Sequence, residues 1–280
     1  AGGRRALTYD GVVTDKHGRV LVSLMGVEMM ELKEHPPFPG MISEEIVLVE
    51  AVERARDQRP EEFITRLLTE EEANEYAEKK VPKRANEWIA GRVAAKTAVL
   101  SAIAGSVQGY DGNGNAPLGS TIRIVTDGNR KPIAELTDRP GEAVAAVSIS
   151  HSNGVAMAAA STEPGFVGLG VDVEKVEERA DSWVQDYFTG EEIAIAGRSD
   201  DRPRTLTAIW ALKEAALKAI GTGLAFDMKD IRISELKPDG HATLEFRNEA
   251  AEYLENTLSG SVEACTENRN GLVIARVTIR

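Results

Sequence analysis

The stretch WALKEAALKAIGTGL, residues 210–224, decides how the rest of this chain is interpreted. In it Trp210, Glu214 and Lys218 follow one another every four residues, so an α-helix would carry all three side chains on one face. Gly221 stands where such a helix would end, because glycine readily adopts the left-handed backbone found just beyond a helix C-terminus. The sequence therefore predicts a helix that presents an aromatic, an acidic and a basic side chain together.

A strand-like segment upstream carries two more carboxylates. In GVDVE, Asp172 and Glu174 are two positions apart, so both side chains project from the same face of a strand. Glu214 could complete a site of three carboxylates for magnesium, a hard cation that takes oxygen ligands and usually keeps substrate phosphates and water. Lys218 would then meet a phosphate. The alternatives are a solvated strand face and an ordinary Glu–Lys pair on a helix surface.

Two loops offer candidates for binding an anion. His151 lies between the hydroxyl residues Ser150 and Ser152, where a predicted strand enters a turn. A histidine flanked by hydroxyls is suited to bind an oxyanion, although a single histidine is more often structural. Arg130 and Lys131 precede a proline in DGNRKPIA, which favours a loop that faces phosphate or simply a charged turn.

An arginine pair marks the predicted helix at about 83–103. Arg84 and Arg92 are eight residues apart, so they lie on roughly one helix face, with Trp88 between them. Guanidinium groups bind phosphate through two parallel hydrogen bonds. The alternative is an exposed helix that is merely rich in arginine.

The two halves of the chain show the same succession of elements. Each gives a strand, a short helix opened by a threonine, a long helix and further strands. In the first half Thr69 precedes Glu72 by three residues, which is typical of a capping box. The long helices carry an aromatic residue, a charge and a lysine at equal spacing. The matched positions would be Trp88, Arg92 and Lys96 in the first helix and Trp210, Glu214 and Lys218 in the second.

This repetition predicts the fold class. We expect an α+β protein that is a pseudo-dimer of two similar halves, at about 41–164 and 165–280. Each half would be a small, mostly antiparallel sheet with a long helix, and the active site would lie between the halves. Residues 1–40 read as a strand, a turn and a strand followed by a proline-rich linker, so we expect them to be the remnant of a preceding domain.

Composition limits the functions available. The 280 residues include 33 basic and 45 acidic side chains, a net charge of −12 that disfavours nonspecific binding of nucleic acid. The sequence shows no membrane span and no signal peptide, and its single cysteine, Cys265, excludes an internal disulfide framework and a cysteine-based zinc site. We therefore expect a cytoplasmic protein. Because the chain opens with alanine, we also expect it to be a segment of a longer protein.

Taken in order, the motifs resemble a known family. The series is KRANEWIAGR, GNRKP, SISHS, GVDVE, F-x-x-E and WALKEAALK-x-x-G-x-GL, and it strongly resembles the phosphopantetheinyl transferases of the surfactin-synthetase-activating type. The resemblance runs from about residue 45 to the end of the chain. GVDVE and WxxKEAxxK are its specific elements, and the other motifs support them.

The resemblance implies an activity and assigns residues to it. The enzyme would move the 4′-phosphopantetheine group of coenzyme A onto a serine of an acyl carrier protein, leaving adenosine 3′,5′-bisphosphate. Magnesium, or manganese in its place, would be held by Asp172, Glu174 and Glu214. Glu214 would also be the general base, with a metal-bound water as the alternative. Coenzyme A would be contacted by Lys213 and Lys218 at its phosphates, and by Arg84, Arg92, Lys131, Ser150 and His151 at its 3′-phosphate, pyrophosphate and adenine end.

A second, shorter resemblance concerns the N-terminus. GVVTDKHGRVLVSLMGVEMMEL is similar to the last strands of a hot-dog dehydratase domain of a polyketide synthase. It implies that the transferase forms the end of a multidomain synthase, whose own carrier domain would be one of the candidate partners. We also expect the transferase portion to be monomeric. Two other functions stay open: another coenzyme A-dependent transferase, such as an acyltransferase, and a non-catalytic carrier-docking module with the same fold.

Overall fold

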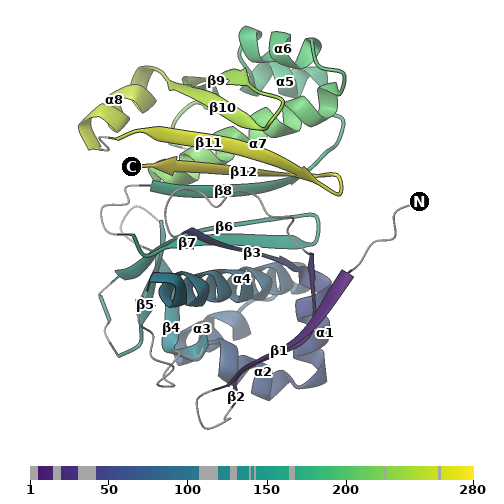
Figure 1. Cartoon of the computed structure of the whole chain (residues 1–280), viewed down its shortest axis with the longest axis vertical. Coiled ribbons are helices and arrows are strands. Elements are labelled where there is room, and N and C mark those ends of the chain that lie inside the picture. Colours follow the sequence, from purple (N-terminus) through teal and green to yellow (C-terminus); the bar gives the residue numbers. More distant parts are fainter. Residues whose placement is uncertain are drawn as a thin grey trace. The chain divides into compact units, whose positions relative to one another are not determined.

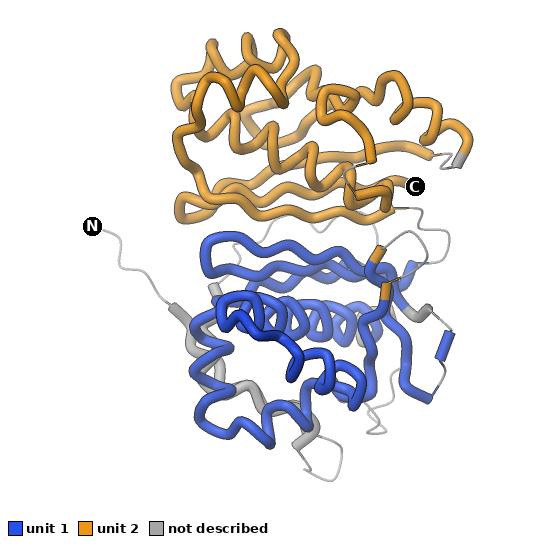
Figure 2. The backbone as a smooth tube through the Cα atoms, turned by 180° about the vertical axis from the view of Figure 1, so that it is seen from behind, with its two compact units in different colours: residues 1–125, 132–164 blue, residues 126–131, 165–280 orange. Residues whose placement is uncertain are grey.

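The computed structural model divides the chain into two compact units (Figures 1 and 2). Unit 1 comprises residues 1–125 and 132–164, and unit 2 comprises residues 126–131 and 165–280. The structure describes residues 6–14, 20–30, 42–106, 119–126, 131–138, 140–141, 143–163, 168–223, 225–257 and 260–280, the first two of these segments as backbone only. In them β1 (Ala6–Thr14) and β2 (Val20–Met30) form an antiparallel pair, as the sequence predicts. The turn and the proline-rich linker predicted around this pair lie outside the described residues.

Unit 1 contains a five-stranded sheet with one long helix against it. The strands are β3 (Ile42–Leu48), β4 (Ile122–Thr126), β5 (Pro132–Leu136), β6 (Ala143–Ser152) and β7 (Val155–Ser161). Their order across the sheet is β3-β7-β6-β5-β4. Between β3 and β4 the chain forms α1 (Val49–Gln58), α2 (Pro60–Leu67), α3 (Glu70–Ala77), α4 (Pro82–Ser106) and the short η1 (Gly119–Thr121). Alanine and valine side chains of α4 pack on β6 and β7 and form the core of this unit.

Unit 2 repeats this plan. Its strands are β8 (Gly168–Lys175), β9 (Ile231–Leu236), β10 (His241–Phe246), β11 (Val262–Arg269) and β12 (Leu272–Ile279), in the order β8-β12-β11-β10-β9. Its helices are α5 (Asp181–Tyr187), α6 (Gly190–Gly197), α7 (Arg202–Ile220), the short η2 (Met228–Asp230) and α8 (Asn248–Thr257). The prediction of two similar α+β halves is therefore confirmed, while the placement of an active site between them stays a prediction.

The central hairpins show that the two units match residue by residue. Asn153-Gly154 joins β6 to β7, and Asn270-Gly271 joins β11 to β12. All four residues have positive φ angles, between 48° and 80° in the first turn and between 51° and 80° in the second. Asn-Gly is the preferred sequence for a two-residue turn of this kind, because both positions need a left-handed backbone. The same turn at the same place fixes the same register in both sheets.

The ends of α7 follow from local chemistry. Its first residue comes after Asp201, whose side chain accepts a hydrogen bond from the Arg204 N–H, so the helix begins well before Trp210. It ends at Gly221, which has a φ of 85°, as the sequence predicts. Among the described residues no helix has both the length and the apolar character needed to cross a lipid bilayer.

Candidate active site

Glycine brings α7 close to the strand that carries the acidic pair. A Cβ atom at Gly170 would lie 1.8 Å from the main-chain oxygen of Ala215 and 2.7 Å from the main-chain nitrogen of Ala219. Only glycine allows this approach without a shift of backbone. Asp172 and Glu174 lie two and four residues after Gly170 on the same strand. Alternate residues of a strand share a face, so both carboxylates lie on the face of β8 that meets α7.

Lys218 joins the helix to this strand. Its ammonium donates to Asp172 Oδ1 at 2.7 Å and to the main-chain oxygen of Val171 at 3.1 Å. The Asp172 residue is only 4% exposed, so the interaction is screened much less than one on the surface. The structure therefore brings together two of the residues expected to act on the ligand.

Glu214, one turn before Lys218 on α7, lies within electrostatic reach of both carboxylates of β8. Burial raises the pKa of Glu214, the negative charges of Asp172 and Glu174 raise it further, and Lys218 opposes them. Three carboxylates in mutual repulsion are a donor set that suits a hard divalent cation.

Internal cations engage the two carboxylates of β8 in this structure. Arg179 lies 3.7 Å from the Glu174 carboxylate and 2.9 Å from that of Glu177, and its guanidinium stands 4.8 Å from the ring centroid of Trp183. Within the described ranges no three acidic, histidine or cysteine side chains gather in a metal-binding arrangement. The chemistry of the donor set fits magnesium, and Asp172, Glu174 and Glu214 are the residues that would hold it.

Lys213 does not face a ligand, which corrects the expectation that it contacts the phosphates. Its side chain has no exposed surface, and its ammonium donates to Glu192 at 2.7 Å, to the Tyr187 oxygen at 3.0 Å and to the Met228 oxygen at 3.1 Å. An ammonium has three donors, and all of them are used here. Lys213 is therefore part of an internal polar cage.

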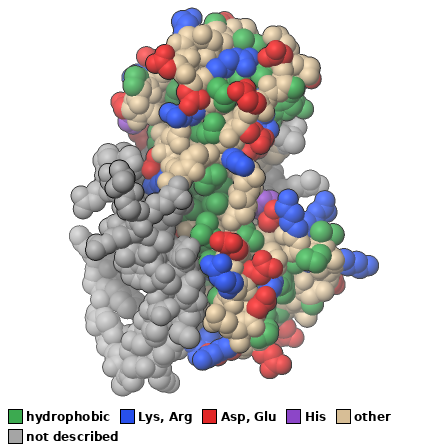
Figure 3. Space-filling model, turned by 90° about the vertical axis from the view of Figure 1, so that its right-hand side faces the viewer, with side chains coloured by type: hydrophobic (Ala, Val, Ile, Leu, Met, Phe, Trp, Pro, Cys, Tyr) green, Lys and Arg blue, Asp and Glu red, His purple; other side chains and the backbone are tan. Residues whose placement is uncertain are grey.

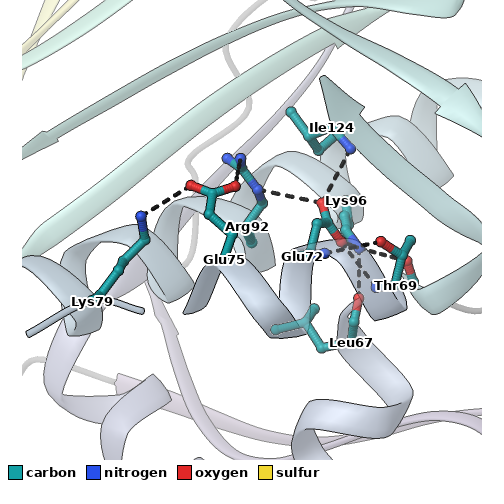
Figure 4. A network of polar contacts seen from close by, with 9 residues as sticks. Leu67, Thr69, Glu72, Glu75, Lys79, Arg92, Lys96 and Ile124 are labelled. Atoms are coloured by element: carbon teal, nitrogen blue, oxygen red, sulfur yellow. Dashed lines mark hydrogen bonds and ion pairs between the residues drawn. The ribbon is translucent and has the colours of Figure 1, made fainter. Parts of the chain in front are cut away.

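The matching residue in unit 1 is Lys96, which corrects the register expected between the long helices. Lys96 pairs with Glu72 and donates to the main-chain oxygens of Leu67 at 2.7 Å and Gly119 at 2.9 Å (Figure 4). This is the arrangement around Lys213, so Lys96 corresponds to Lys213. The sequence pattern paired it with Lys218, which lies five positions further along.

Lys131 caps the end of α7. Its ammonium donates to the main-chain oxygen of Ala219 at 2.9 Å, and its aliphatic chain lies beside Gly221. A cation at this place is favourable, because the unpaired carbonyl groups of a helix C-terminus carry partial negative charge. The structure thus places Lys131 in unit 2, bonded to the residue that follows Lys218.

Ser150 and His151 point to opposite sides of their sheet. They are adjacent residues of β6, opposite Met157 and Ala156 of β7, and successive side chains of a strand alternate between its faces. Ser150 is buried and His151 is exposed. The histidine and its two serines therefore do not form one group, although Ser150 and Ser152 share a face.

Arg92 is held within unit 1, whereas Arg84 is exposed on α4. The Arg92 guanidinium lies 3.3 Å from Glu72 and 3.9 Å from Glu75 (Figure 4). It also lies 4.4 Å from the ring centroid of Trp88. A phosphate at Arg92 would have to compete with these two carboxylates. On the face drawn in Figure 3 the acidic and basic side chains of the described residues are interspersed, so attraction of an anionic ligand depends on local groups.

The sequence pattern missed two residues that organise the site. Glu192 holds Lys213, and Arg179 holds Glu174. The signal for Glu192 was present, because Thr189 precedes it by three residues and the two form a capping box like that of Thr69 and Glu72.

The two units share one architecture, and unit 2 gathers carboxylates and a lysine between a strand and a helix. This combination suits an enzyme that handles a phosphorylated ligand through a divalent cation. The family model of the 4′-phosphopantetheinyl transferase superfamily, ACPS, matches residues 168–274, which contain this whole arrangement.

Curated relatives agree with the family model. A holo-[acyl-carrier-protein] synthase from Geobacillus sp. is 38% identical over 114 residues, covering 41% of this chain and 87% of the relative. Another from Treponema denticola is 31% identical over 122 residues, covering 41% of this chain and 98% of the relative. Among solved structures, the holo-[acyl-carrier-protein] synthase of Neisseria meningitidis is 21% identical, with a TM-score of 0.37 and coverage of 41% of this chain and 98% of that one. The chain belongs to the 4′-phosphopantetheinyl transferase superfamily and is an enzyme of that family.

Proposed function

We propose that the chain transfers the 4′-phosphopantetheine group of coenzyme A to a serine of an acyl carrier protein or carrier domain, in a reaction that requires magnesium. The observation that carries this proposal is the approach of α7 to β8, which sets Lys218 on Asp172 and brings Glu214 within reach of both strand carboxylates. This arrangement lies inside the segment that the family model matches.

The residues of the candidate site would have distinct roles. Asp172, Glu174 and Glu214 would hold the cation, which when bound supplies neutralisation of the pyrophosphate charge and a fixed orientation for it. Lys218, which pairs with Asp172 at 2.7 Å in this structure, would supply an ammonium for a phosphate oxygen of coenzyme A. Protein catalysis of phosphoryl transfer consists mainly of such positioning and charge stabilisation.

Transfer makes one bond and breaks one bond. The serine oxygen of the carrier bonds to the β-phosphorus of coenzyme A, and the bond from that phosphorus to the bridging oxygen breaks, so adenosine 3′,5′-bisphosphate leaves with the electron pair. We assign the serine proton to Glu214, the carboxylate of α7 that lies within electrostatic reach of Asp172 and Glu174.

The duplicated plan supports the surfactin-synthetase-activating type of transferase. The relatives that match nearly end to end cover only about two fifths of this chain, 41% in each case. Because this chain already contains two similar units, it needs no second copy to bring two units together. We therefore propose that the transferase portion is monomeric. We also propose that it acts in the cytoplasm as part of a polyketide synthase, on the basis of the resemblance of its N-terminal segment to a dehydratase domain.

One assay tests the activity. The protein is incubated with an apo acyl carrier protein, coenzyme A and magnesium, and mass spectrometry follows the carrier. We expect each carrier to gain one phosphopantetheine group and the solution to gain adenosine 3′,5′-bisphosphate. Addition of a chelator should stop both, and magnesium or manganese should restore them. A carrier that stays unmodified would contradict the proposal and favour a docking module.

The same assay with acyl-coenzyme A separates the proposal from an acyltransferase. An acyltransferase would release free coenzyme A and leave no nucleotide product. It would also need a histidine or cysteine beside the thioester. Cys265 and His241 lie opposite each other on β11 and β10, but β12 separates these strands from β8 and its carboxylates.

A further inference from the structure

A buried glutamate ties three elements of unit 2 together. Glu192 accepts hydrogen bonds from the Thr189 N–H at the start of α6 at 2.8 Å, from the Ile233 N–H of β9 at 2.8 Å, and from Lys213 of α7 at 2.7 Å. Lys213 in turn donates to main-chain oxygens at the end of α5 and in η2. Both side chains of the pair have no exposed surface. We call Glu192, Lys213 and these partners the unit 2 cage.

Unit 1 contains the same device. Glu72 accepts hydrogen bonds from the Thr69 N–H of α3 and the Ile124 N–H of β4, both at 3.1 Å, and from Lys96 of α4 (Figure 4). The unit 1 cage therefore fixes α3, α4 and β4 as the unit 2 cage fixes α6, α7 and β9. Its presence provides an internal control, because the same chemistry can be removed from either unit.

The two cage lysines are followed by different residues on their helices. The residue after the cage lysine is Glu214 on α7 but Thr97 on α4, and the fifth residue after it is Lys218 on α7 but Ser101 on α4. Consecutive residues of a helix are rotated by about 100° about its axis. A lysine locked on one side of α7 therefore sets the direction of Glu214 and Lys218 on the side that faces β8.

We propose that the unit 2 cage positions α7, so that Glu214 and Lys218 meet Asp172 in the geometry that a divalent cation requires. Lys213 and Glu192 are then positioning residues for the metal site, and the unit 1 cage serves the stability of its own unit. This inference rests on the proposed function, because it takes the carboxylates of β8 and α7 as metal ligands.

The experiment compares Lys213→Met with Lys96→Met. Each change replaces a buried lysine with an uncharged side chain of similar volume. The partner carboxylate is then buried without its cation, so both variants should lose stability in thermal denaturation. Binding of Mn²⁺ is measured by calorimetry on the full chain with saturating coenzyme A. We expect Lys213→Met to weaken Mn²⁺ binding roughly 10- to 100-fold, as loss of an outer-shell partner does. Lys96→Met should leave the Mn²⁺ affinity unchanged.

Two further variants separate position from stability. Glu192→Gln keeps the shape of the side chain, so it tests the cage even if Lys213→Met does not fold. In the double variant Glu192→Gln/Lys213→Met no unpaired charge stays buried, so stability should recover relative to Lys213→Met while Mn²⁺ binding stays weak.

Four outcomes would overturn the proposal. The first is an equal loss of Mn²⁺ affinity in the Lys213 and Lys96 variants, and the second is no loss in the Lys213 variant. The third is recovery of Mn²⁺ binding together with stability in the double variant. The fourth is failure of both unit 2 single variants to fold. Absence of Mn²⁺ binding by the unmodified protein is a different result. It would refute the metal assignment itself, and with it this inference.

Discussion

The two units keep the same framework but carry different chemistry. Their hairpins turn at equivalent Asn-Gly pairs, and their buried glutamate–lysine cages join equivalent elements. A third equivalence is on the outer strands. Arg123 of β4 pairs with Glu71 and Glu135, and Arg232 of β9 pairs with Glu191 and Glu245. These shared groups join elements of their own unit, and none of them is a candidate ligand of the cation.

The strands at the other edge show where the units diverge. Leu48 of β3 lies opposite the first residue after its hairpin turn, as Lys175 of β8 does. Counting back from these two residues, Glu45 corresponds to Asp172 and Val47 to Glu174. On α4, Thr97 stands at the position of Glu214 and Ser101 at that of Lys218. Unit 1 therefore keeps one of the three carboxylates and has no lysine at the position of Lys218. The comparison teaches that the fold was duplicated whole, whereas the acidic cluster exists in only one copy.

The sharpest test of this difference exchanges the matched acidic residues for alanine. Asp172→Ala should lower transfer by more than the roughly 100-fold that loss of an outer-shell partner of a metal costs, because it removes a direct ligand. Glu45→Ala, its counterpart in unit 1, should leave transfer close to that of the unmodified protein. Both are measured as rates of carrier modification per folded molecule. If the two variants lost activity equally, the assignment of chemistry to unit 2 alone would fail.

A second test uses the close approach of helix and strand. Gly170 corresponds to Ser43 of β3 by the same count, so unit 1 accepts a side chain where unit 2 does not. Gly170→Ala forces a Cβ against the backbone of α7 and should cost about 3 kcal/mol of unfolding free energy, the upper end of the range for overpacking. Ser43→Ala should cost little. Denaturant unfolding measures both, and a tolerant Gly170→Ala variant would show that α7 can move away from β8.

A third test exploits the buried lysine of unit 1. Burial lowers the pKa of Lys96 to about 8 from 10.5, Glu72 opposes the shift, and Arg92 adds to it. Between these two pH values the unfolded chain still binds the proton that the folded protein has released, so stability rises with pH. The difference in unfolding free energy between the unmodified protein and Lys96→Met should therefore grow by about 2–3 kcal/mol from pH 8 to pH 10.5. A difference that stays constant over this interval would contradict the lowered pKa of Lys96.

Local signals predicted most of the elements of this fold. Thr69 with Glu72 predicted the capping box that opens α3, and Gly221 predicted the end of α7. The strand β11, VEACTENR, was missed, because its polar residues hide the apolar alternation that marks a half-buried strand. The apolar run IVLVEAV, residues 46–52, suggests a strand by its composition, but the chain enters α1 at Val49. Burial and pairing in the folded unit decide such apolar runs, and periodicity alone does not.

The candidate site was predicted in part for a similar reason. The spacing of Asp172 and Glu174 gave the shared face, because alternation along a strand is a local property. Which lysine of α7 faces the acidic pair is set by tertiary packing, so the sequence could not show that Lys218 reaches Asp172 while Lys213 is sealed inside the cage. The repeated capping boxes at Thr69 and Thr189 were the available signal for the correct register.

The smallest effect is expected from the segment that has no counterpart in unit 2. The pair β1 and β2 precedes the duplicated plan, and a two-stranded hairpin by itself is marginally stable in water. The elements that carry Asp172, Glu214 and Lys218 all lie in unit 2. Deletion of residues 1–39 should therefore leave transfer to a free carrier domain nearly unchanged, with at most a modest loss of stability where β2 contacts α1 and β3. The measurement is the rate of carrier modification at saturating coenzyme A. A large fall in that rate, in a protein that still unfolds cooperatively, would show that the N-terminal segment belongs to the transferase and that the boundary near residue 40 is wrong.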